Sequence, residues 1–359
     1  MKRIILLGAT GSIGTSACDV VRAHSGEFRI VALAVRSNLA AAGFLGREFG
    51  AKVYSGEDGA LRAVEENEAD IVLVATVGLS GLKPTLAAIR KGMDVALATK
   101  EVLVAAGEFV TREAAAANVR MLPVDSEHSA VFQCLQGADS AREVSRLILT
   151  ASGGPFLDAP ADLDTVTPAQ ALKHPRWDMG QKVTVDSSTM MNKGFEIIEA
   201  RWLFDIPVER IDVVVHPESI VHSLVEFADG ATLAQLSPPD MRVPIQYALT
   251  WPRRLPSQRA VLDLAALSSL TFRSPDENRF PALRLVREAE KAGGTRTAVL
   301  SAADEIAVSR FLCGDIRYTD FVRLAADTVE RAPEIRCDSV AAVLEADRIA
   351  RELAKDWRA

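Results

Sequence analysis

A glycine-rich turn near the start of the chain constrains its fold more than any other feature. The motif Gly8-Ala9-Thr10-Gly11-Ser12-Ile13-Gly14 follows an apolar run at residues 3–7 and opens a helical segment at residues 12–23. Glycines let the backbone turn sharply and approach a pyrophosphate, while the following helix offers free N–H groups at its start. The turn therefore predicts the first strand–helix unit of a dinucleotide-binding sheet; the alternative is a plain tight turn.

Short apolar runs alternate with helical segments up to about residue 122. Runs rich in Ile, Val and Leu occupy residues 3–7, 30–35, 71–75 and 95–98, and the segments between them include residues 12–23 and 84–91. Strands that are apolar throughout are typical of a parallel sheet covered on both faces. Residues 1–122 are therefore predicted to form a Rossmann-like, doubly wound α/β domain.

Two further parts follow in the sequence. Between residues 123 and 250, strands of a second sheet are predicted at residues 147–150, 183–185, 211–215 and 223–227, separated by long Gly-, Pro- and Asp-rich loops. Such loops often carry function, so we expect an α+β catalytic domain here. After a linker at residues 251–279, amphipathic segments predict a C-terminal helical bundle domain at 280–359, with helices at residues 282–292, 297–313, 319–331 and 339–357.

Charge and composition exclude several classes of function. The chain has 48 acidic and 41 basic residues, a formal net charge of −7, and 6% aromatic residues. Binding to nucleic acid is not expected, because the chain offers neither a net positive charge nor many aromatic rings for stacking. No apolar stretch approaches the roughly 20 residues of a membrane span. The four cysteines form no C-x-x-C pair, so we expect reduced thiols and a cytoplasmic protein.

The residues after the second predicted strand indicate which dinucleotide is bound. An NAD protein usually has an acidic residue there, but this chain has Arg36, Ser37 and Asn38. A guanidinium can pair with a 2′-phosphate, which a carboxylate would repel. The sequence therefore favours NADP(H), with an ordinary surface arginine as the alternative.

Two acidic residues near the end of the first domain predict a metal site. Asp125 and Glu127 follow a strand pattern, and residues two apart on a strand point to the same side. Like charges so close require a cation or raise each other's pKa. Oxygen ligands suit Mg²⁺ or Mn²⁺. The alternative is two unrelated surface charges.

A second polar segment, at residues 186–196, is dense in hydroxyl, amide and ammonium groups. Ser187, Asn192 and Lys193 could hold a phosphate, and Glu196 could be a third metal ligand. The loop that begins at Ser152, with the sequence SGGPF, offers further N–H donors to an anion. An amphipathic helix and a simple turn are the respective alternatives.

Histidine and tryptophan residues occur in two further motifs. His174 and Trp177 lie in the segment HPRWDMG, whose composition suits a lid that closes over a substrate. His222 lies in HPESIVHS. Structural roles are the alternative for all three side chains. No serine or cysteine stands in a recognisable triad with them, so nucleophilic catalysis is not indicated.

Together and in this order, the motifs closely resemble the 1-deoxy-D-xylulose 5-phosphate reductoisomerase family. The resemblance spans residues 8–242 and rests on GATGSIG, TKE (residues 99–101), PVDSEHSA, SGGPF, KHPRWDMG, DSSTMMNKGFE, HPESIVHS and SPPDMR. It implies NADPH-dependent isomerisation and reduction of 1-deoxy-D-xylulose 5-phosphate to 2-C-methyl-D-erythritol 4-phosphate, in non-mevalonate isoprenoid biosynthesis. It also implies a homodimer.

The resemblance carries over to individual residues of this chain. It implies that NADPH is bound by Thr10, Gly11, Ser12, Ile13, Arg36, Ser37, Asn38, Thr99, Glu101 and Gly180. The metal, Mg²⁺ or Mn²⁺ with Co²⁺ as a further candidate, is bound by Asp125, Glu127 and Glu196. The implied substrate-binding residues are Lys100, Ser126, Glu127, Ser152, His174, Ser187, Asn192, Lys193 and Glu196. The implied catalytic residues are Lys100, Glu127, His174, Trp177 and His222, with Met179 in the lid and Met241 in the pocket.

Four positions depart from the commonest family pattern. Ala9 replaces a usual serine, Arg36-Ser37 stands where glycine-lysine is frequent, and Thr99 replaces a frequent asparagine. These differences concern the preference for NADPH over NADH and leave the metal and phosphate residues untouched. The proton-transfer group is open among Lys100, His174 and a metal-bound water.

Two other functions remain as alternatives at this level. One is a metal-independent NADP-dependent oxidoreductase acting on another phosphorylated substrate, which a chelator would not inhibit. The other is a redox-sensing module that binds NADP(H) as an effector, which would leave Asp125, Glu127 and Glu196 unexplained.

Overall fold

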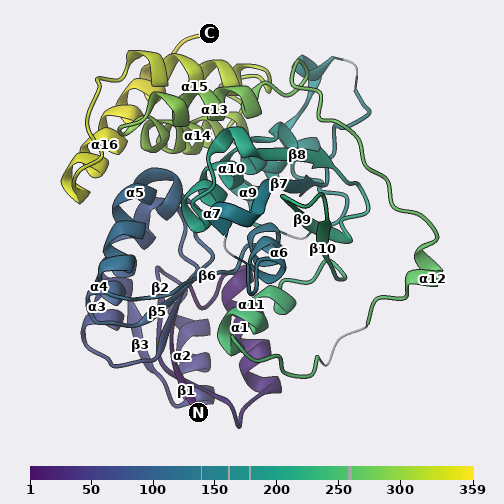
Figure 1. Cartoon of the computed structure of the whole chain (residues 1–359). Coiled ribbons are helices and arrows are strands. Elements are labelled where there is room, and N and C mark those ends of the chain that lie inside the picture. Colours follow the sequence, from purple (N-terminus) through teal and green to yellow (C-terminus); the bar gives the residue numbers. More distant parts are fainter. Residues whose placement is uncertain (139, 161, 178, 258–260) are drawn as a thin grey trace. The chain divides into compact units, whose positions relative to one another are not determined.

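The computed structural model describes all residues except 139, 161, 178 and 258–260 (Figure 1). The chain forms two compact units, each built from separated stretches of sequence. Unit 1 comprises Met1–Val102, Val110–Gln133 and Asp240–Leu262, and unit 2 comprises Leu103–Phe109, Cys134–Pro239 and Asp263–Ala359.

Unit 1 contains a six-stranded parallel sheet in the order β3-β2-β1-β4-β5-β6. The predicted doubly wound sheet is therefore confirmed, and its four apolar runs are β1, β2, β4 and β5. The edge strands β3 and β6 were not predicted, because neither is a continuous run of Ile, Val and Leu. The strands are β1 (Lys2–Leu7), β2 (Phe28–Val35), β3 (Lys52–Ser55), β4 (Ile71–Val74), β5 (Asp94–Leu97) and β6 (Met121–Pro123).

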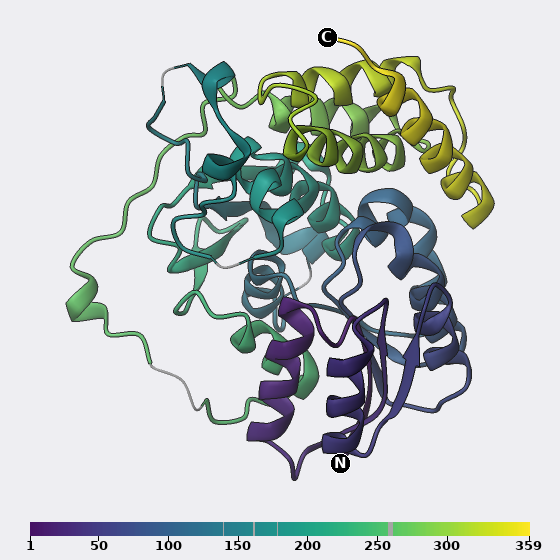
Figure 2. The same ribbon diagram turned by 180° about the vertical axis from the view of Figure 1, so that it is seen from behind.

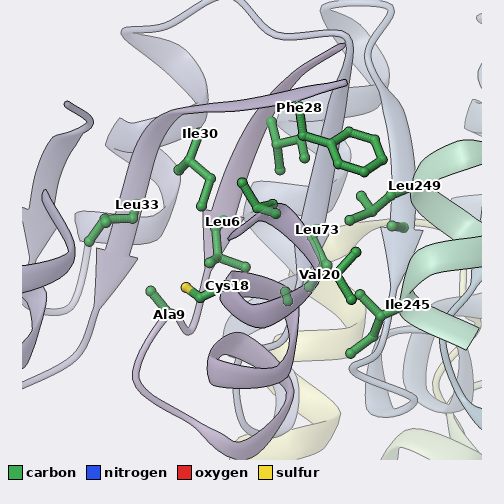
Figure 3. Close-up of a cluster of buried hydrophobic side chains, with 14 of the residues drawn as sticks. Leu6, Ala9, Cys18, Val20, Phe28, Ile30, Leu33, Leu73, Ile245 and Leu249 are labelled. Carbon is green, nitrogen blue, oxygen red and sulfur yellow. The ribbon is translucent and has the colours of Figure 1, made fainter. Parts of the chain in front are cut away.

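Helices cover both faces of this sheet (Figures 1 and 2). On one face lie α1 (Ser12–Ala23), α2 (Leu39–Phe49) and α11 (Arg242–Thr250), and on the other lie α3 (Gly59–Glu65) and α4 (Leu82–Arg90). Figure 3 shows how the first face is filled: Ile245 and Leu249 of α11 lie in one buried cluster with Val20 of α1 and Leu73 of β4. A segment from late in the sequence thus completes the core of the first domain.

Two helices follow the carboxyl ends of β5 and β6. They are α5 (Glu101–Ala116) and α6 (Ser126–Cys134). Helix α5 is interrupted at Ala106, whose φ of −141° is not helical. Residues 103–109 around this break belong to unit 2.

Unit 2 contains a four-stranded mixed sheet in the order β10-β9-β7-β8. Strand β7 is parallel to β8 and antiparallel to β9. The strand predicted at residues 183–185 is wrong, because these residues lie in helix α9. Strand β10 was not predicted. The strands are β7 (Val144–Ala151), β8 (Ile211–Val215), β9 (Val221–Phe227) and β10 (Thr232–Leu236).

Helices α9 (Gln181–Thr189) and α10 (Met191–Phe204) belong to the same unit as four C-terminal helices. All four helical segments predicted at the C-terminus are present, as α13 (Ala282–Ala292), α14 (Arg296–Leu312), α15 (Asp320–Arg331) and α16 (Val340–Asp356). Ser339 caps α16 by accepting a hydrogen bond from the Ala342 N–H at 3.2 Å. The remaining short helices are η1 (Gly78–Gly81), α7 (Ser140–Glu143), η2 (Leu163–Thr165), α8 (Pro168–Ala171), η3 (Val208–Arg210) and α12 (Leu264–Leu267).

Among the described residues, no helix combines the length and the apolar character needed to cross a membrane.

Candidate functional site

The glycine-rich turn lies at the carboxyl end of β1, where the sheet order reverses between β1 and β4. Gly8 has a φ of +83°, and a Cβ there would overlap the carbonyl oxygen of Ala75, which follows β4. A side chain is therefore excluded at this position. Gly11 precedes α1 without a side-chain cap, so the first N–H groups of the helix are left for an anion.

Arg36, Ser37 and Asn38 follow β2, the strand next to β1, and all three are exposed. They therefore lie at the same edge of the sheet as the glycine turn. The Asn38 side chain also has a local role, because its Oδ1 accepts a hydrogen bond from the Ala41 N–H at 3.2 Å and caps α2. Of the three, Arg36 is the residue with the charge that a 2′-phosphate requires.

Lys100 and Asp125 form an ion pair at the carboxyl ends of β5 and β6. Their Nζ and Oδ2 atoms are 2.9 Å apart, and both side chains are largely buried. Residues 25 positions apart meet here because the two parallel strands end at the same edge of the sheet. The pair neutralises a carboxylate that would otherwise be costly to bury.

The predicted geometry of Asp125 and Glu127 is wrong in one respect. Strand β6 ends at Pro123 and helix α6 begins at Ser126, so the two carboxylates do not alternate along a strand. They are close because Asp125 lies at the start of a helix: its Oδ1 accepts a hydrogen bond from the Glu127 N–H at 3.2 Å. The Ser126 hydroxyl donates to Glu127 Oε2 at 2.6 Å.

The surroundings of this ion pair add one residue that the sequence did not single out. His128 is fully buried, and its Nδ1 lies 3.3 Å from Asp125 Oδ1. The neighbouring Thr99 and Glu101 are also buried. Thr99 donates its hydroxyl hydrogen to the Thr76 carbonyl oxygen at 2.7 Å, which fixes the segment that carries Lys100.

In unit 2, polar side chains surround the junction of α9 and α10. Met190 separates the two helices with a φ of 65°, and Ser187 lies in the last turn of α9. Glu196 is buried on α10, where its Oε1 accepts a hydrogen bond from Asn192 Nδ2 at 2.6 Å and its Oε2 pairs with Lys193 Nζ. The predicted phosphate residues and the predicted third carboxylate are therefore close in space.

The loop with Ser152 packs directly against this junction. Gly154 has a φ of +66°, and a Cβ there would lie 2.7 Å from the Ser187 carbonyl oxygen, so a glycine is required. Ser152 Oγ accepts a hydrogen bond from the Gly154 N–H at 3.3 Å. The two donor-rich segments predicted from the sequence are thus neighbours, with backbone against backbone.

His174 orients the Ser152 hydroxyl. Its Nδ1 accepts the N–H groups of Arg176 and Trp177 at 3.2 and 2.9 Å, so its Nε2 carries the hydrogen and donates to Ser152 Oγ at 3.0 Å. Burial lowers the pKa of His174 to about 4. The imidazole is therefore neutral near pH 7, and the Ser152 hydroxyl hydrogen is free to point elsewhere.

His222 is also neutral. Burial lowers its pKa to about 4, and its Nε2–H donates to the Ser237 carbonyl oxygen at 3.1 Å. The Trp177 ring packs edge-on against it, with ring centroids 6.3 Å apart. The lid motif therefore contacts the second histidine motif within unit 2.

Three further residues predicted from the sequence lie just before helices. Gly180 precedes the first turn of α9, and Met179 lies beside it. Met241 precedes α11 and packs partly against the core of unit 1.

The donor chemistry of both units suits a hard divalent cation. Asp125 and Glu127 of unit 1 and Glu196 of unit 2 offer carboxylate oxygens, the ligands that Mg²⁺ prefers. Unit 1 also offers a turn closed to side chains beside an uncapped helix start, with Arg36 at the same edge of the sheet, which suits a phosphorylated dinucleotide.

Three family models match the chain. The model described as 1-deoxy-D-xylulose 5-phosphate reductoisomerase matches residues 4–53 and 43–107. The model for the C-terminal domain of the same enzyme matches residues 121–204. A further DXP reductoisomerase C-terminal domain model matches residues 236–353.

Similar proteins cover the full length of the chain. It is 49% identical to the 1-deoxy-D-xylulose 5-phosphate reductoisomerase of Symbiobacterium thermophilum, over 99% of this chain and 98% of the relative. Among solved structures, the enzyme of Zymomonas mobilis in complex with NADPH has a TM-score of 0.92 and 39% identity, with 98% of both chains covered. A DOX-P reductoisomerase in complex with NADPH, fosmidomycin and magnesium has the same TM-score and 37% identity, covering 99% of this chain and 98% of that one.

Proposed function

This chain belongs to the 1-deoxy-D-xylulose 5-phosphate reductoisomerase family, and we propose which of its residues carry out that family's reaction. The reaction is the isomerisation and NADPH-dependent reduction of 1-deoxy-D-xylulose 5-phosphate to 2-C-methyl-D-erythritol 4-phosphate, with a divalent metal. The observation that carries the assignment of residues is the pair of lysine–carboxylate clusters, one in each unit.

Asp125, Glu127 and Glu196 are proposed to hold the metal. In support, all three are carboxylates, and each lies beside a polar side chain or a backbone N–H that orients it. A bound Mg²⁺ or Mn²⁺ supplies Lewis-acid polarisation of the carbonyl and hydroxyl oxygens of the substrate. Lys100 and Lys193 neutralise two of these carboxylates when no cation is bound.

The substrate phosphate is proposed to bind at the junction of α9 and α10. Ser152, Ser187, Asn192 and Lys193 supply hydroxyl, amide and ammonium donors from two adjacent segments. Because Ser152 Oγ already accepts from His174 and Gly154, its hydrogen is available to a phosphate oxygen. Holding the phosphate keeps the reacting carbons in register, which is worth several kcal/mol, on the order of 7 or more for well-aligned groups.

His174 and His222 are proposed to act as neutral hydrogen-bonding groups that line the substrate site. Their lowered pKa values support this assignment, since neither imidazole is charged near pH 7. Lys100, which pairs with Asp125, is proposed as the proton-transfer group, and Ser126, the residue after Asp125, is proposed to contact the substrate. Trp177 and Met179 would close over the substrate as a lid and exclude water.

NADPH is proposed to bind along the carboxyl edge of the unit 1 sheet. The pyrophosphate would lie on the turn Thr10, Gly11, Ser12 and Ile13, and the 2′-phosphate on Arg36 with Ser37 and Asn38. Thr99, Glu101 and Gly180 are proposed to contact the nicotinamide half.

The proposed functional division of the chain is a nucleotide part at 1–122, a catalytic part at 123–250, a linker at 251–279 and a helical part at 280–359. We further propose a cytoplasmic homodimer. In support of the dimer, β10 is an edge strand of the unit 2 sheet, and Leu233 on it is 50% exposed.

Oxidation of NADPH, followed by absorbance with 1-deoxy-D-xylulose 5-phosphate as substrate, tests the proposal. We expect turnover with Mg²⁺ or Mn²⁺, loss of turnover in excess EDTA, and recovery when the metal is restored. Absence of oxidation with either metal would contradict the proposed reaction. Turnover that persists in EDTA would contradict the metal site.

A further inference from the structure

We propose, on the basis of the function proposed above, that the C-terminal helices position the phosphate-binding segments through Tyr318 and Asp304. Tyr318 bonds to Ser188 and Asp304 pairs with Lys182, and neither of these partners is among the four residues assigned to the phosphate, so both act as positioning residues. The C-terminal region is predicted from its sequence pattern as a helical bundle without catalytic features. Its packing within unit 2 indicates that it also supports the phosphate-binding segments.

Tyr318 contacts both phosphate-binding segments. It is 4% exposed, and its hydroxyl donates to the Ser188 carbonyl oxygen at 2.5 Å. Its ring packs edge-on against Phe156 with centroids 5.3 Å apart. Ser188 follows Ser187 directly, and Phe156 ends the SGGPF loop, so one side chain supports both segments.

The two segments cannot move independently, because they already touch through their backbones. A Cβ on Gly154 would lie 2.7 Å from the Ser187 carbonyl oxygen and 3.0 Å from the Ser188 Cα atom. Backbones packed with no room for a Cβ between them transmit a small displacement of one segment to the other. A residue that contacts both segments therefore helps to set the spacing between Ser152 and Ser187.

Asp304 fixes α9 from a second direction. This residue of α14 is fully buried, and its Oδ2 lies 2.8 Å from Lys182 Nζ at the start of α9. The same ammonium pairs with Asp186 Oδ2 at 2.6 Å, and it also lies 5.0 Å from the centroid of the Phe195 ring of α10. One lysine thus connects α9, α10 and α14, next to Ser187.

The charges of this cluster indicate which substitution at Asp304 should be tolerated. Burial, and then the neighbouring Asp186, raise the pKa of Asp304 well above its ordinary value; Lys182 acts against this, and Glu305 adds to it. Asparagine matches the shape of aspartate and keeps a side-chain oxygen that can lie against the Lys182 ammonium group. Asp304→Asn therefore preserves the contact with Lys182, whereas Asp304→Leu removes it.

Steady-state kinetics on the full chain separates positioning from a general loss of stability. We expect Asp304→Leu and Tyr318→Phe to raise KM for 1-deoxy-D-xylulose 5-phosphate, about tenfold and about threefold, because small displacements of binding groups are costly. KM for NADPH should stay within about twofold in both variants, since NADPH binding is assigned mainly to unit 1. Asp304→Asn should restore the KM of the parent protein.

Two control variants remove a buried hydroxyl and a surface carboxylate elsewhere in the C-terminal helices. Thr328→Val removes a buried hydroxyl that donates to the Leu324 carbonyl oxygen at 2.8 Å, within α15. Asp327→Leu removes a carboxylate paired with Arg331 at 3.1 Å, also within α15. Both should leave the KM for the sugar phosphate unchanged; Thr328→Val should lower the midpoint of thermal unfolding, and Asp327→Leu, at an exposed ion pair, should change it little.

Two outcomes would overturn the inference. One is an unchanged KM in both Asp304→Leu and Tyr318→Phe, with a lower unfolding midpoint alone. The other is an equal rise of KM in the controls. A parent protein that does not turn over this sugar phosphate contradicts the proposed function instead. Thermal stabilisation by inorganic phosphate, present in the parent protein and lost in Asp304→Leu, then tests the positioning by itself.

Discussion

The lysine–carboxylate pairs of the two units are built in different ways. In unit 1, Lys100 and Asp125 are 25 residues apart and meet because β5 and β6 end at one edge of a parallel sheet. In unit 2, Lys193 and Glu196 are three residues apart on one helix. The first pair retains 10% and 13% side-chain exposure, and the second retains 6% and 2%. The pair at the sheet edge thus keeps more of its side-chain surface accessible, whereas the helical pair is almost fully enclosed by what packs around α10.

The largest effect is expected when Glu196, in the buried pair of unit 2, is replaced. This substitution tests whether the pair takes part in metal binding. Glu196→Gln keeps the shape of the side chain but removes its charge, so we expect kcat to fall by about 10³-fold or more. The affinity for NADPH, measured by fluorescence titration, should remain within about twofold.

Asp125→Asn is the matched change in unit 1. A loss of turnover of similar size in both variants, and a higher metal concentration at half-maximal activity, would support a role of both carboxylates in metal binding. Activity like that of the parent protein in Glu196→Gln would remove this residue from the metal site.

A somewhat smaller loss of kcat is expected when Lys100, the lysine of the unit 1 pair, is replaced. Lys100→Ala removes the partner of Asp125 and the proposed proton-transfer group, and general acid–base groups typically contribute about 10²–10⁴-fold. The measured quantity is kcat across a range of pH. Lys52→Ala, an exposed change on the edge strand β3, is the control. Full activity in Lys100→Ala would leave proton transfer to another group.

A smaller change in kinetics is expected at the carboxyl edge of the unit 1 sheet, where NADPH is proposed to bind. Arg36→Ala is expected to raise KM for NADPH about tenfold and to leave KM for NADH nearly unchanged, because a lost charge-assisted pair with a phosphate costs about 1.5–3 kcal/mol. Arg47→Ala, another exposed arginine in unit 1, is the control. Equal changes for both nucleotides would show that Arg36 does not read the 2′-phosphate.

The last expected effect concerns acid stability rather than activity and belongs to unit 2. The pKa values of His174 and His222 are about 4, below their ordinary value of 6.5, because both side chains are buried. Between pH 6.5 and 4 the unfolded chain binds more protons than the folded one, so stability falls as the pH falls through this window.

His222→Phe should remove about 2–3 kcal/mol of this dependence, since it deletes one buried group with a shift of that size. Denaturant unfolding at pH 7 and pH 4.5 measures it. An unchanged difference between the two pH values would show that His222 is not the group that titrates.

The sequence predicts the sheet of unit 1 well because its strands are continuous apolar runs and its turn needs glycine. It fails where local pattern and packing disagree. The β-branched residues Val183, Thr184 and Val185 favour a strand, yet Lys182 and Asp186 on either side pair across one turn of α9. Tertiary packing overrides a weak local preference here.

The candidate site shows the same limit. Asp125 and Glu127 are predicted together, but a helix start rather than a strand brings them close. His128 was missed because a single histidine beside two acids has no distinctive pattern. Asp304 and Tyr318 were missed for a different reason: their partners lie more than a hundred residues away, and amphipathic periodicity carries no information about contacts at that distance.

The return of the chain to unit 1 through α11 also bears on how the protein folds as it is synthesised. Domains generally fold as they emerge, from the N-terminus onward. Here Ile245 and Leu249 fill the same core as Val20 and Leu73, so the nucleotide-binding core stays incomplete until α11 has been made (Figure 3). Residues Cys134–Pro239 of unit 2 are synthesised before α11, so the core of unit 1 can close only after they have emerged. A fragment ending before residue 240 would therefore expose an apolar face and be prone to aggregate.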